Sequence, residues 1–184
     1  MKKHVCVFCG SRQGSNPDWS EWAEAFGGHI AVLGHTLIFG GCAGGLMGKV
    51  AQGAINQGGE VVGIIPEQLI EKEGLVKDLS EVHYVQTMSE RKEWMSKIAH
   101  AFVILPGGIG TLDEFSEVWT NAQIGFHTKP IILVNWSGYY DHLLYFLESC
   151  AKNGMMTDAH FEKIQIVDTP EDLYGALIAL TDSI

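Results

Sequence analysis

Short apolar segments alternate with segments of helical period along almost the whole chain. Seven mostly apolar runs have the length and continuous hydrophobicity of strands buried on both faces, and they lie at 4–9, 36–39, 60–65, 81–86, 101–105, 130–135 and 163–167. Between these runs, apolar residues recur at helical spacing. The predicted helices lie at 17–33, 67–72, 88–100, 111–124 and 138–153, and two more end at about residues 57 and 180. The alternation predicts an α/β fold of three layers, in which helices cover both faces of a mostly parallel sheet of about seven strands.

Length and composition predict a single domain over residues 1–184. The sequence is 46% hydrophobic and 18% charged, which is typical of globular proteins and not of disordered ones. No apolar run is long enough for a membrane span. The N-terminal apolar run is too short for a signal peptide, so we expect a cytoplasmic protein. The net charge of −10 argues against a nucleic-acid polymer as partner.

The cysteines do not predict a metal site. Cys6 and Cys9 form a C-x-x-C pattern, but on a strand they point to opposite faces of the sheet. No second pair completes a zinc-binding set, and the histidines have no ligand spacing. The sequence therefore predicts buried free thiols and no structural metal.

A glycine-rich turn follows the fifth predicted strand, where Pro106-Gly107-Gly108-Ile109-Gly110-Thr111 leads into a helix. Glycines let a ligand approach the backbone closely, and the free N–H groups at a helix N-terminus favour an anion. The spacing is neither a Walker loop nor a dinucleotide fingerprint, so it predicts a site for a single phosphate. The alternative is a capping box between Thr111 and Glu114, which needs no ligand.

Other polar loops follow strand ends in the same way. The segments 10–15, 40–48 and 106–111 all leave the C-terminal ends of predicted strands, as does the segment with Arg91. In a parallel sheet these ends share one edge, so the loops are expected to converge on one site. The only arginines, Arg12 and Arg91, both fall at this edge. For Arg91 the alternative is a solvated helix start, which is weakened because positive charge is disfavoured in a first helical turn.

These residues together suggest cleavage of an N-glycosidic bond. The glycine loops offer a phosphate pocket, and Glu114 lies one helical turn beyond it. A carboxylate can hold ribose hydroxyls and stabilise an oxocarbenium-like transition state, as in glycoside hydrolysis. Arg91 could stabilise charge that develops on the departing base.

The chain resembles one known family in particular. Its pattern Pro106-Gly107-Gly108-x-Gly110-Thr111-x-x-Glu114, preceded by Arg91-Lys92-x-x-Met95, is similar to the paired signature of the Lonely Guy (LOG) family. Members are cytokinin riboside 5′-monophosphate phosphoribohydrolases, and bacterial ones often carry the older label lysine decarboxylase. The similarity extends over nearly the whole chain, including 5–11, 40–48, 63–66 and 123–130.

The resemblance implies a Rossmann-like homodimer with its site near the subunit interface. It implies hydrolysis of a purine nucleoside 5′-monophosphate, either AMP or one with an N6-substituted adenine, to free base and ribose 5-phosphate without a cofactor. It also implies that Arg91 and Glu114 are the catalytic pair. The remaining substrate contacts that it implies are Gly107, Gly108, Gly110, Thr111, Met88, Lys92, Ser11, Gly41 and Gly45.

Some positions depart from the family's pattern. Cys42 stands where many members have a third glycine, Ala43-Gly44 is unusual inside that loop, and His100 replaces a common aspartate. The loop change bears on the local ligand geometry and on the preferred base.

Two other functions remain open from the sequence. A non-catalytic nucleotide-binding or carrier protein of Rossmann type would need the glycine loops but not Glu114. A lysine decarboxylase would need pyridoxal phosphate on a lysine, and no lysine here lies in a motif for it.

Overall fold

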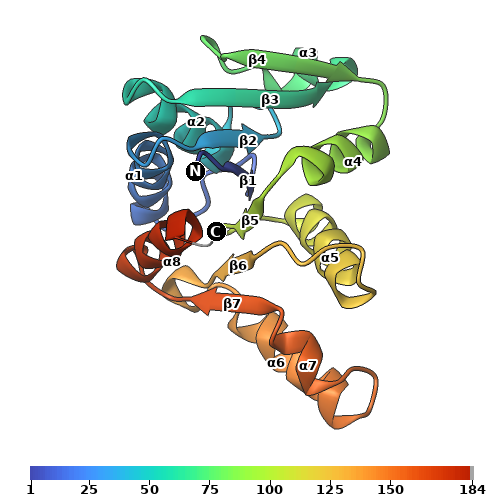
Figure 1. Cartoon of the computed structure of the whole chain (residues 1–184). Helices are drawn as coiled ribbons and strands as arrows, with labels where there is room; N and C mark the ends of the chain where they lie inside the picture. Colours follow the sequence, from blue (N-terminus) through green and yellow to red (C-terminus); the bar gives the residue numbers. More distant parts are fainter. Residues whose placement is uncertain (183–184) are drawn as a thin grey trace.

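The computed structural model describes residues 1–182, and the strands among them form one parallel sheet in the order β4-β3-β2-β1-β5-β6-β7 (Figure 1). The strands are β1 His4–Phe8, β2 Thr36–Phe39, β3 Glu60–Pro66, β4 Glu81–Val85, β5 Ala101–Ile104, β6 Ile131–Val134 and β7 Ile164–Val167. The predicted parallel sheet is confirmed. Its strand order reverses at β1, between β2 and β5, so a ligand site is expected beyond the C-terminal ends of these central strands.

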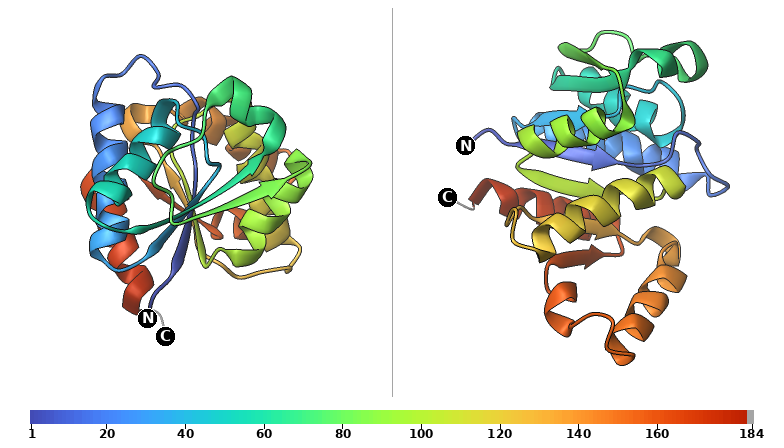
Figure 2. Two further views of the ribbon diagram at one scale, coloured as in Figure 1. Left: turned by 90° about the horizontal axis from the view of Figure 1, so that it is seen from above. Right: turned by 90° about the vertical axis from the view of Figure 1, so that its right-hand side faces the viewer.

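Helices cover both faces of the sheet. They are α1 Asp18–Val32, α2 Gly45–Asn56, α3 Glu67–Glu73, α4 Met88–Ile98, α5 Ile109–Gln123, the 3₁₀ turn η1 Trp136–Gly138, α6 Asp141–Lys152, α7 Asp158–Phe161 and α8 Pro170–Asp182. Figures 1 and 2 show α1 and α8 on one side of the sheet and α4 and α5 on the other. The three-layer α/β architecture predicted from the alternation is therefore confirmed.

The central strand β1 supplies both halves of the core because successive side chains of a strand point to opposite faces. Val5, Val7 and Cys9 pack with the cluster that contains the buried residues of α1, α2 and α8. Cys6 and Phe8 pack with the cluster from α4 and α5. The two thiols thus lie on opposite faces as predicted, and both are free and buried.

Two helix starts differ from the sequence predictions. Helix α5 begins at Ile109 with Gly108 as its N-cap and no side-chain cap, so the capping box that Thr111 would have started is wrong. Helix α6 begins at Asp141 and not near residue 138. There the Asn135 side chain accepts a hydrogen bond from the Tyr140 N–H at 2.7 Å and stabilises a separate turn, η1, before the helix.

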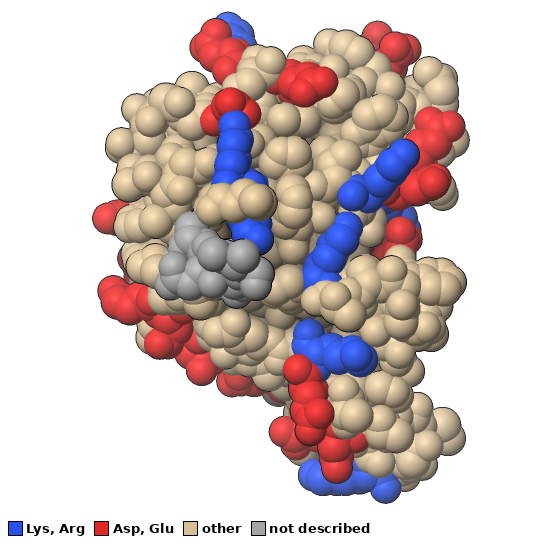
Figure 3. Space-filling view, viewed as in Figure 1, with Lys and Arg blue, Asp and Glu red and all other residues tan. Residues whose placement is uncertain are grey.

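Charged side chains of both signs are exposed on one face of the molecule (Figure 3). On the face shown in Figure 3, basic side chains lie beside acidic ones. Ion pairs such as Lys49–Glu24 and Lys92–Glu117 join the two kinds. Within residues 1–182, no helix is long and apolar enough to cross a membrane. The same part of the chain holds no group of three or more His, Cys, Asp or Glu side chains arranged to bind a metal ion.

Candidate active site

A cavity of about 770 Å³ lies at the C-terminal edge of the sheet, where the strand order reverses. Its walls come from the loop after β1, the start of α2, helix α3, the start of α4, the turn between β5 and α5, and Tyr139 after β6. The expected convergence of the strand-end loops is therefore confirmed. Both arginines, Arg12 and Arg91, also line this cavity.

The structure brings together most, but not all, of the residues that the sequence suggested. The cavity is lined by Ser11, Met88, Arg91, Gly107, Gly108, Gly110, Thr111 and Glu114. Gly41, Gly45 and Lys92 are not among its lining residues. The cavity as a whole joins segments from six different strand ends, which only the fold places side by side.

Arg91 is buried and not a solvated helix start, with 5% of its surface exposed. It lies in the first turn of α4, whose N-cap Thr87 accepts a hydrogen bond from the Glu90 N–H at 3.1 Å. The Arg91 Nε donates to the carbonyl of Ile64 on β3 at 3.0 Å, which holds the guanidinium across the strand ends. A fixed cation that is removed from water is well suited to stabilise negative charge in the cavity.

Glu114 faces Arg91 from α5. It is 5% exposed, and its Oε1 lies 3.8 Å from the Arg91 Nη1. Burial raises the pKa of Glu114 from its ordinary 4.5 to about 7, although the positive charge of Arg91 works in the opposite direction. The distance is too long for a tight hydrogen-bonded pair, so burial prevails. A carboxyl group that titrates near neutral pH can both accept and donate a proton there.

The glycine turn before α5 is interlocked with the loop after β1. The Gly10 N–H donates to the carbonyl of Pro106 at 3.0 Å. At Gly107 a side chain would collide with the Thr111 hydroxyl, so only glycine fits this position. The first N–H groups of α5 have no acceptor within the helix. Together with the helix dipole, such groups favour an anion.

The three suggested residues outside the cavity contact other parts of the protein. A side chain at Gly45 would collide with the backbone of Ser11 and Arg12, so this glycine allows α2 to approach the β1 loop. Gly41 has a positive φ of 80° and packs on Ile65. The Lys92 ammonium contacts Asp113 at 2.9 Å and Glu117 at 2.7 Å, and these carboxylates, Glu117 first, raise its pKa.

The unusual residues of the second glycine loop do not line the cavity. Cys42 is buried, its Sγ accepts from the Gly44 N–H at 3.3 Å, and its backbone bridges to Leu75. These contacts attach the loop to the segment after α3. His100 precedes β5 at the other end of that strand, where its Nδ1 accepts from the His4 N–H at 2.9 Å.

Two residues that contact the site residues were not among those predicted from the sequence. Gly40 lies under the Arg91 guanidinium, and a side chain there would collide with its Nη2. Tyr139 reaches the cavity from the turn after β6, and its hydroxyl donates to the Gly107 carbonyl at 2.7 Å. The Gly40-Gly41 pair marks a glycine turn in the sequence, but Arg91, which Gly40 contacts, lies 51 residues further along the chain. No motif in the sequence around Tyr139 indicates that this residue reaches the cavity.

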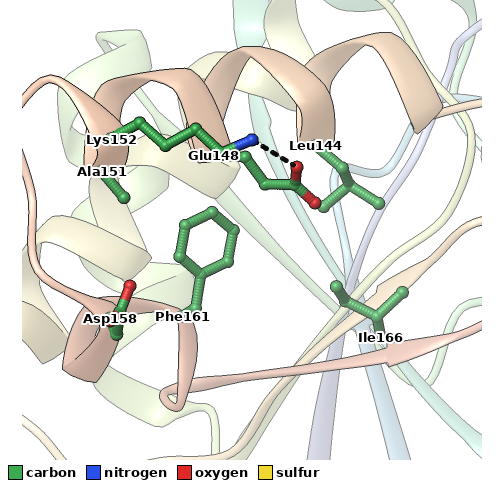
Figure 4. Close-up of a pocket in the computed structure, with 7 residues that line it drawn as sticks. All are labelled: Leu144, Glu148, Ala151, Lys152, Asp158, Phe161 and Ile166. Carbon is green, nitrogen blue, oxygen red and sulfur yellow. Dashed lines mark ion pairs between the residues drawn. The ribbon is translucent and has the colours of Figure 1, made fainter.

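A second cavity, of about 550 Å³, lies between α6, α7 and β7 (Figure 4). Leu144, Phe161 and Ile166 form its apolar lining. Its basic group, Lys152, pairs with Glu148 at 3.8 Å, and both side chains are more than half exposed. No buried charged residue is among those that line it, so it lacks the features that make the first cavity a candidate active site.

Comparisons with known proteins show the family of this chain. The family model described as "Possible lysine decarboxylase" matches residues 47–177. A protein of Oryza sativa subsp. japonica named probable cytokinin riboside 5′-monophosphate phosphoribohydrolase is 42% identical over 158 residues, which cover 86% of this chain and 70% of that protein. The chain belongs to the LOG family. Another relative, the cytokinin riboside 5′-monophosphate phosphoribohydrolase of Rhodococcoides fascians, is 39% identical over 97% of this chain and 89% of its own length.

More distant solved structures share the LOG-family fold. The molybdenum cofactor binding protein of Rippkaea orientalis has a TM-score of 0.75 at 22% identity, with 98% of both chains covered. The Moco carrier protein of Chlamydomonas reinhardtii has a TM-score of 0.76 at 19% identity, with both chains covered completely. At this identity the likeness shows a common Rossmann-like fold.

Proposed function

We propose that this protein hydrolyses the N-glycosidic bond of purine nucleoside 5′-monophosphates and releases the free base and ribose 5-phosphate. The observation that carries the proposal is Glu114, a buried carboxyl group with a pKa of about 7 that faces Arg91 in the cavity beside the glycine turn. The names of the LOG-family relatives support the same reaction.

The phosphate of the substrate binds at the N-terminus of α5. Gly107, Gly108, Gly110 and Thr111 supply backbone N–H groups and a hydroxyl, and Ser11 and Met88 line the same cavity. Glu114 lies three residues beyond Thr111, about one helical turn of roughly 5.4 Å. An anchored phosphate therefore holds the ribose next to this carboxylate. Gly45 supports the loop after β1 through the backbone of Ser11 and Arg12, whereas Gly41 and Lys92 have no direct contact with the substrate in this proposal.

The reaction needs one bond broken and one formed. The bond from C1′ to the base nitrogen breaks, and its electron pair leaves with the base. Arg91 stabilises the negative charge that develops on the base, while the ionised Glu114 stabilises the oxocarbenium-like ribose. Water then bonds to C1′ and gives a proton to Glu114, and Glu114 passes this proton on toward the departing base.

The test is the release of base from purified protein. Incubation with AMP, and separately with isopentenyladenosine monophosphate, is followed by liquid chromatography of free base and ribose 5-phosphate. We expect both products from at least one substrate, and the ratio of the two rates gives the base preference. Glu114→Gln should abolish release, whereas Glu117→Gln, one turn further along α5 and outside the cavity, should retain it. Full activity in Glu114→Gln would contradict the mechanism.

The same experiment separates the other candidate functions. AMP binding without release of base would favour a non-catalytic nucleotide carrier. Decarboxylation of lysine through pyridoxal phosphate needs a lysine that can form a Schiff base with the cofactor, and none of the described residues that line the cavity is a lysine. The cavity does not fit that cofactor chemistry.

We also propose a homodimer that forms through the face of α4 and α5. Large apolar side chains are exposed there, namely Met88, Trp94, Ile109 and Ile124, followed by Phe126. In this proposal they form one apolar patch, and contiguous exposed apolar patches are typical of surfaces that a partner covers. Met88 and Ile109 also line the cavity, so the second subunit would lie near its mouth. Analytical ultracentrifugation of the wild type and of Phe126→Glu tests this, since a wild-type monomer would refute the dimer.

A further inference from the structure

The turn η1, which follows β6 and lies close to the cavity, is held in place by hydrogen bonds of Asn135. Asn135 accepts from the Tyr140 N–H at 2.7 Å and donates to Asp141 at 2.9 Å and to Asp168 at 3.2 Å. Ser137 has a positive φ of 56°, which is rare for a residue with a side chain. Such backbone strain persists only where the surroundings hold the turn in place, so η1 is a fixed support for the residue that follows it.

Tyr139 projects from this support to the glycine turn. Its hydroxyl donates to the Gly107 carbonyl at 2.7 Å. Its ring meets the Trp19 ring edge to face at 5.0 Å and the Tyr140 ring edge to face at 4.8 Å. Two aromatic contacts and one hydrogen bond therefore fix the side chain, although 41% of its surface is exposed.

The Gly107 carbonyl controls the direction of a donor in the phosphate site. The peptide between Gly107 and Gly108 is planar and trans, so the Gly108 N–H points opposite to the Gly107 carbonyl. Glycine has the widest choice of backbone angles, and a Gly-Gly peptide can rotate by about half a turn with little steric resistance. Rotation would exchange the N–H for a carbonyl oxygen, which repels a phosphate. A bond to the carbonyl opposes that rotation.

We infer that Tyr139 is a positioning residue for the phosphate group of the substrate and acts by holding the Gly107–Gly108 peptide in its anion-binding orientation. The inference rests on the proposed function for the identity of the ligand, a nucleoside 5′-monophosphate or ribose 5-phosphate. It adds a residue from the turn after β6 to a site otherwise built from the β1 to β5 strand ends.

Tyr140 offers a matched control. Its hydroxyl donates to the carbonyl of Leu105 at 2.8 Å, two residues before Gly107, but the side chain is buried and does not line the cavity. Tyr139→Phe and Tyr140→Phe each remove one hydroxyl from adjacent residues. The Tyr140 hydroxyl also has a hydrogen bond with the Gly107 backbone, but only the Tyr139 hydroxyl donates to the Gly107 carbonyl, which belongs to the Gly107–Gly108 peptide. The two variants therefore differ in whether this peptide loses its donor.

The measurements are the Kd values of ribose 5-phosphate, AMP and adenosine by titration calorimetry, the KM and kcat for AMP, and the thermal midpoint. For Tyr139→Phe we expect the Kd of ribose 5-phosphate and the KM for AMP to rise about fivefold, the change typical of one lost neutral hydrogen bond. The kcat and the Kd of adenosine should stay within about twofold, since neither depends on the phosphate orientation. Tyr140→Phe should lower the thermal midpoint and leave the Kd of ribose 5-phosphate unchanged.

The outcomes separate this inference from the proposed function. An unchanged Kd of ribose 5-phosphate in Tyr139→Phe would overturn it, and so would an equal rise in Tyr140→Phe, which would show a general structural effect. A wild type that releases no base but binds ribose 5-phosphate more tightly than Tyr139→Phe does would end the proposed reaction and support the inference. A wild type that binds neither AMP nor ribose 5-phosphate would overturn both.

Discussion

Replacement of Glu114 by glutamine should make the protein more stable at alkaline pH while it abolishes release of base. The carboxyl group is 5% exposed, and burial raises its pKa from 4.5 to about 7. A shift of one pKa unit corresponds to about 1.4 kcal/mol, so the folded protein disfavours the ionised group by about 3 kcal/mol. Glutamine has a similar shape and no charge, and therefore removes this penalty.

The sign follows from the numbers of bound protons. Between pH 4.5 and 7 the folded state retains the Glu114 proton, whereas the unfolded state has released it, so the free energy of unfolding falls as the pH rises. Well above pH 7, Glu114 is ionised in both the folded and the unfolded state, and the free energy of unfolding falls no further for this reason. About 2.5 kcal/mol of the total is lost between pH 5 and 8.

The assay is urea unfolding of the wild type and Glu114→Gln at pH 5 and pH 8. The difference in unfolding free energy between variant and wild type should be about 2.5 kcal/mol larger at pH 8 than at pH 5. Glu117→Gln, which removes a partly exposed carboxylate from the same helix, controls for a general effect of lost charge. A variant whose stability changes with pH in parallel with the wild type would refute the claim that burial controls the ionisation of Glu114.

The remaining predictions concern the reaction. The kcat/KM for the nucleotide should rise with pH to a plateau, with its midpoint near 7, because Glu114 must be ionised; a flat profile from pH 5 to 8 contradicts this role. Arg91→Lys loses the bond to the Ile64 carbonyl, and release of base should fall about 100-fold or more while ribose 5-phosphate still binds. Gly40→Ala should have a similar effect because the new methyl group displaces the guanidinium, whereas Gly175→Ala, which meets open space, should not; equal activities would contradict the contact.

The sheet could be predicted from the sequence because each apolar run has only one stable environment. A strand such as His4–Phe8, apolar on both faces, must be covered on both sides, and the helical segments between the strands are the cover. The same reasoning placed the glycine turn and Arg91 at one edge, since parallel strands end together. Local chemistry and connectivity were sufficient for these features.

Element boundaries were less predictable where side chains compete with the backbone. Helix α6 begins at Asp141, later than predicted, because the Asn135 side chain accepts the hydrogen bond of the Tyr140 N–H. The pattern of Thr111 and Glu114 suggested a cap, but α5 starts two residues earlier at Ile109, and both side chains are buried. Sequence spacing alone does not distinguish a cap from two positions that face a cavity.

The sequence by itself determined the fold class and the glycine turn, because hydrophobic period and motif spacing depend on nearby residues, and it suggested Arg91 and Glu114 through the family resemblance. Only the tertiary structure decided how these groups behave. Burial, which no local pattern reports, raises the Glu114 pKa and removes Arg91 from water. The contacts of Gly40 with Arg91 and of Tyr139 with Gly107 join residues 51 and 32 positions apart. They exist because the sheet brings the ends of separate strands together at one edge.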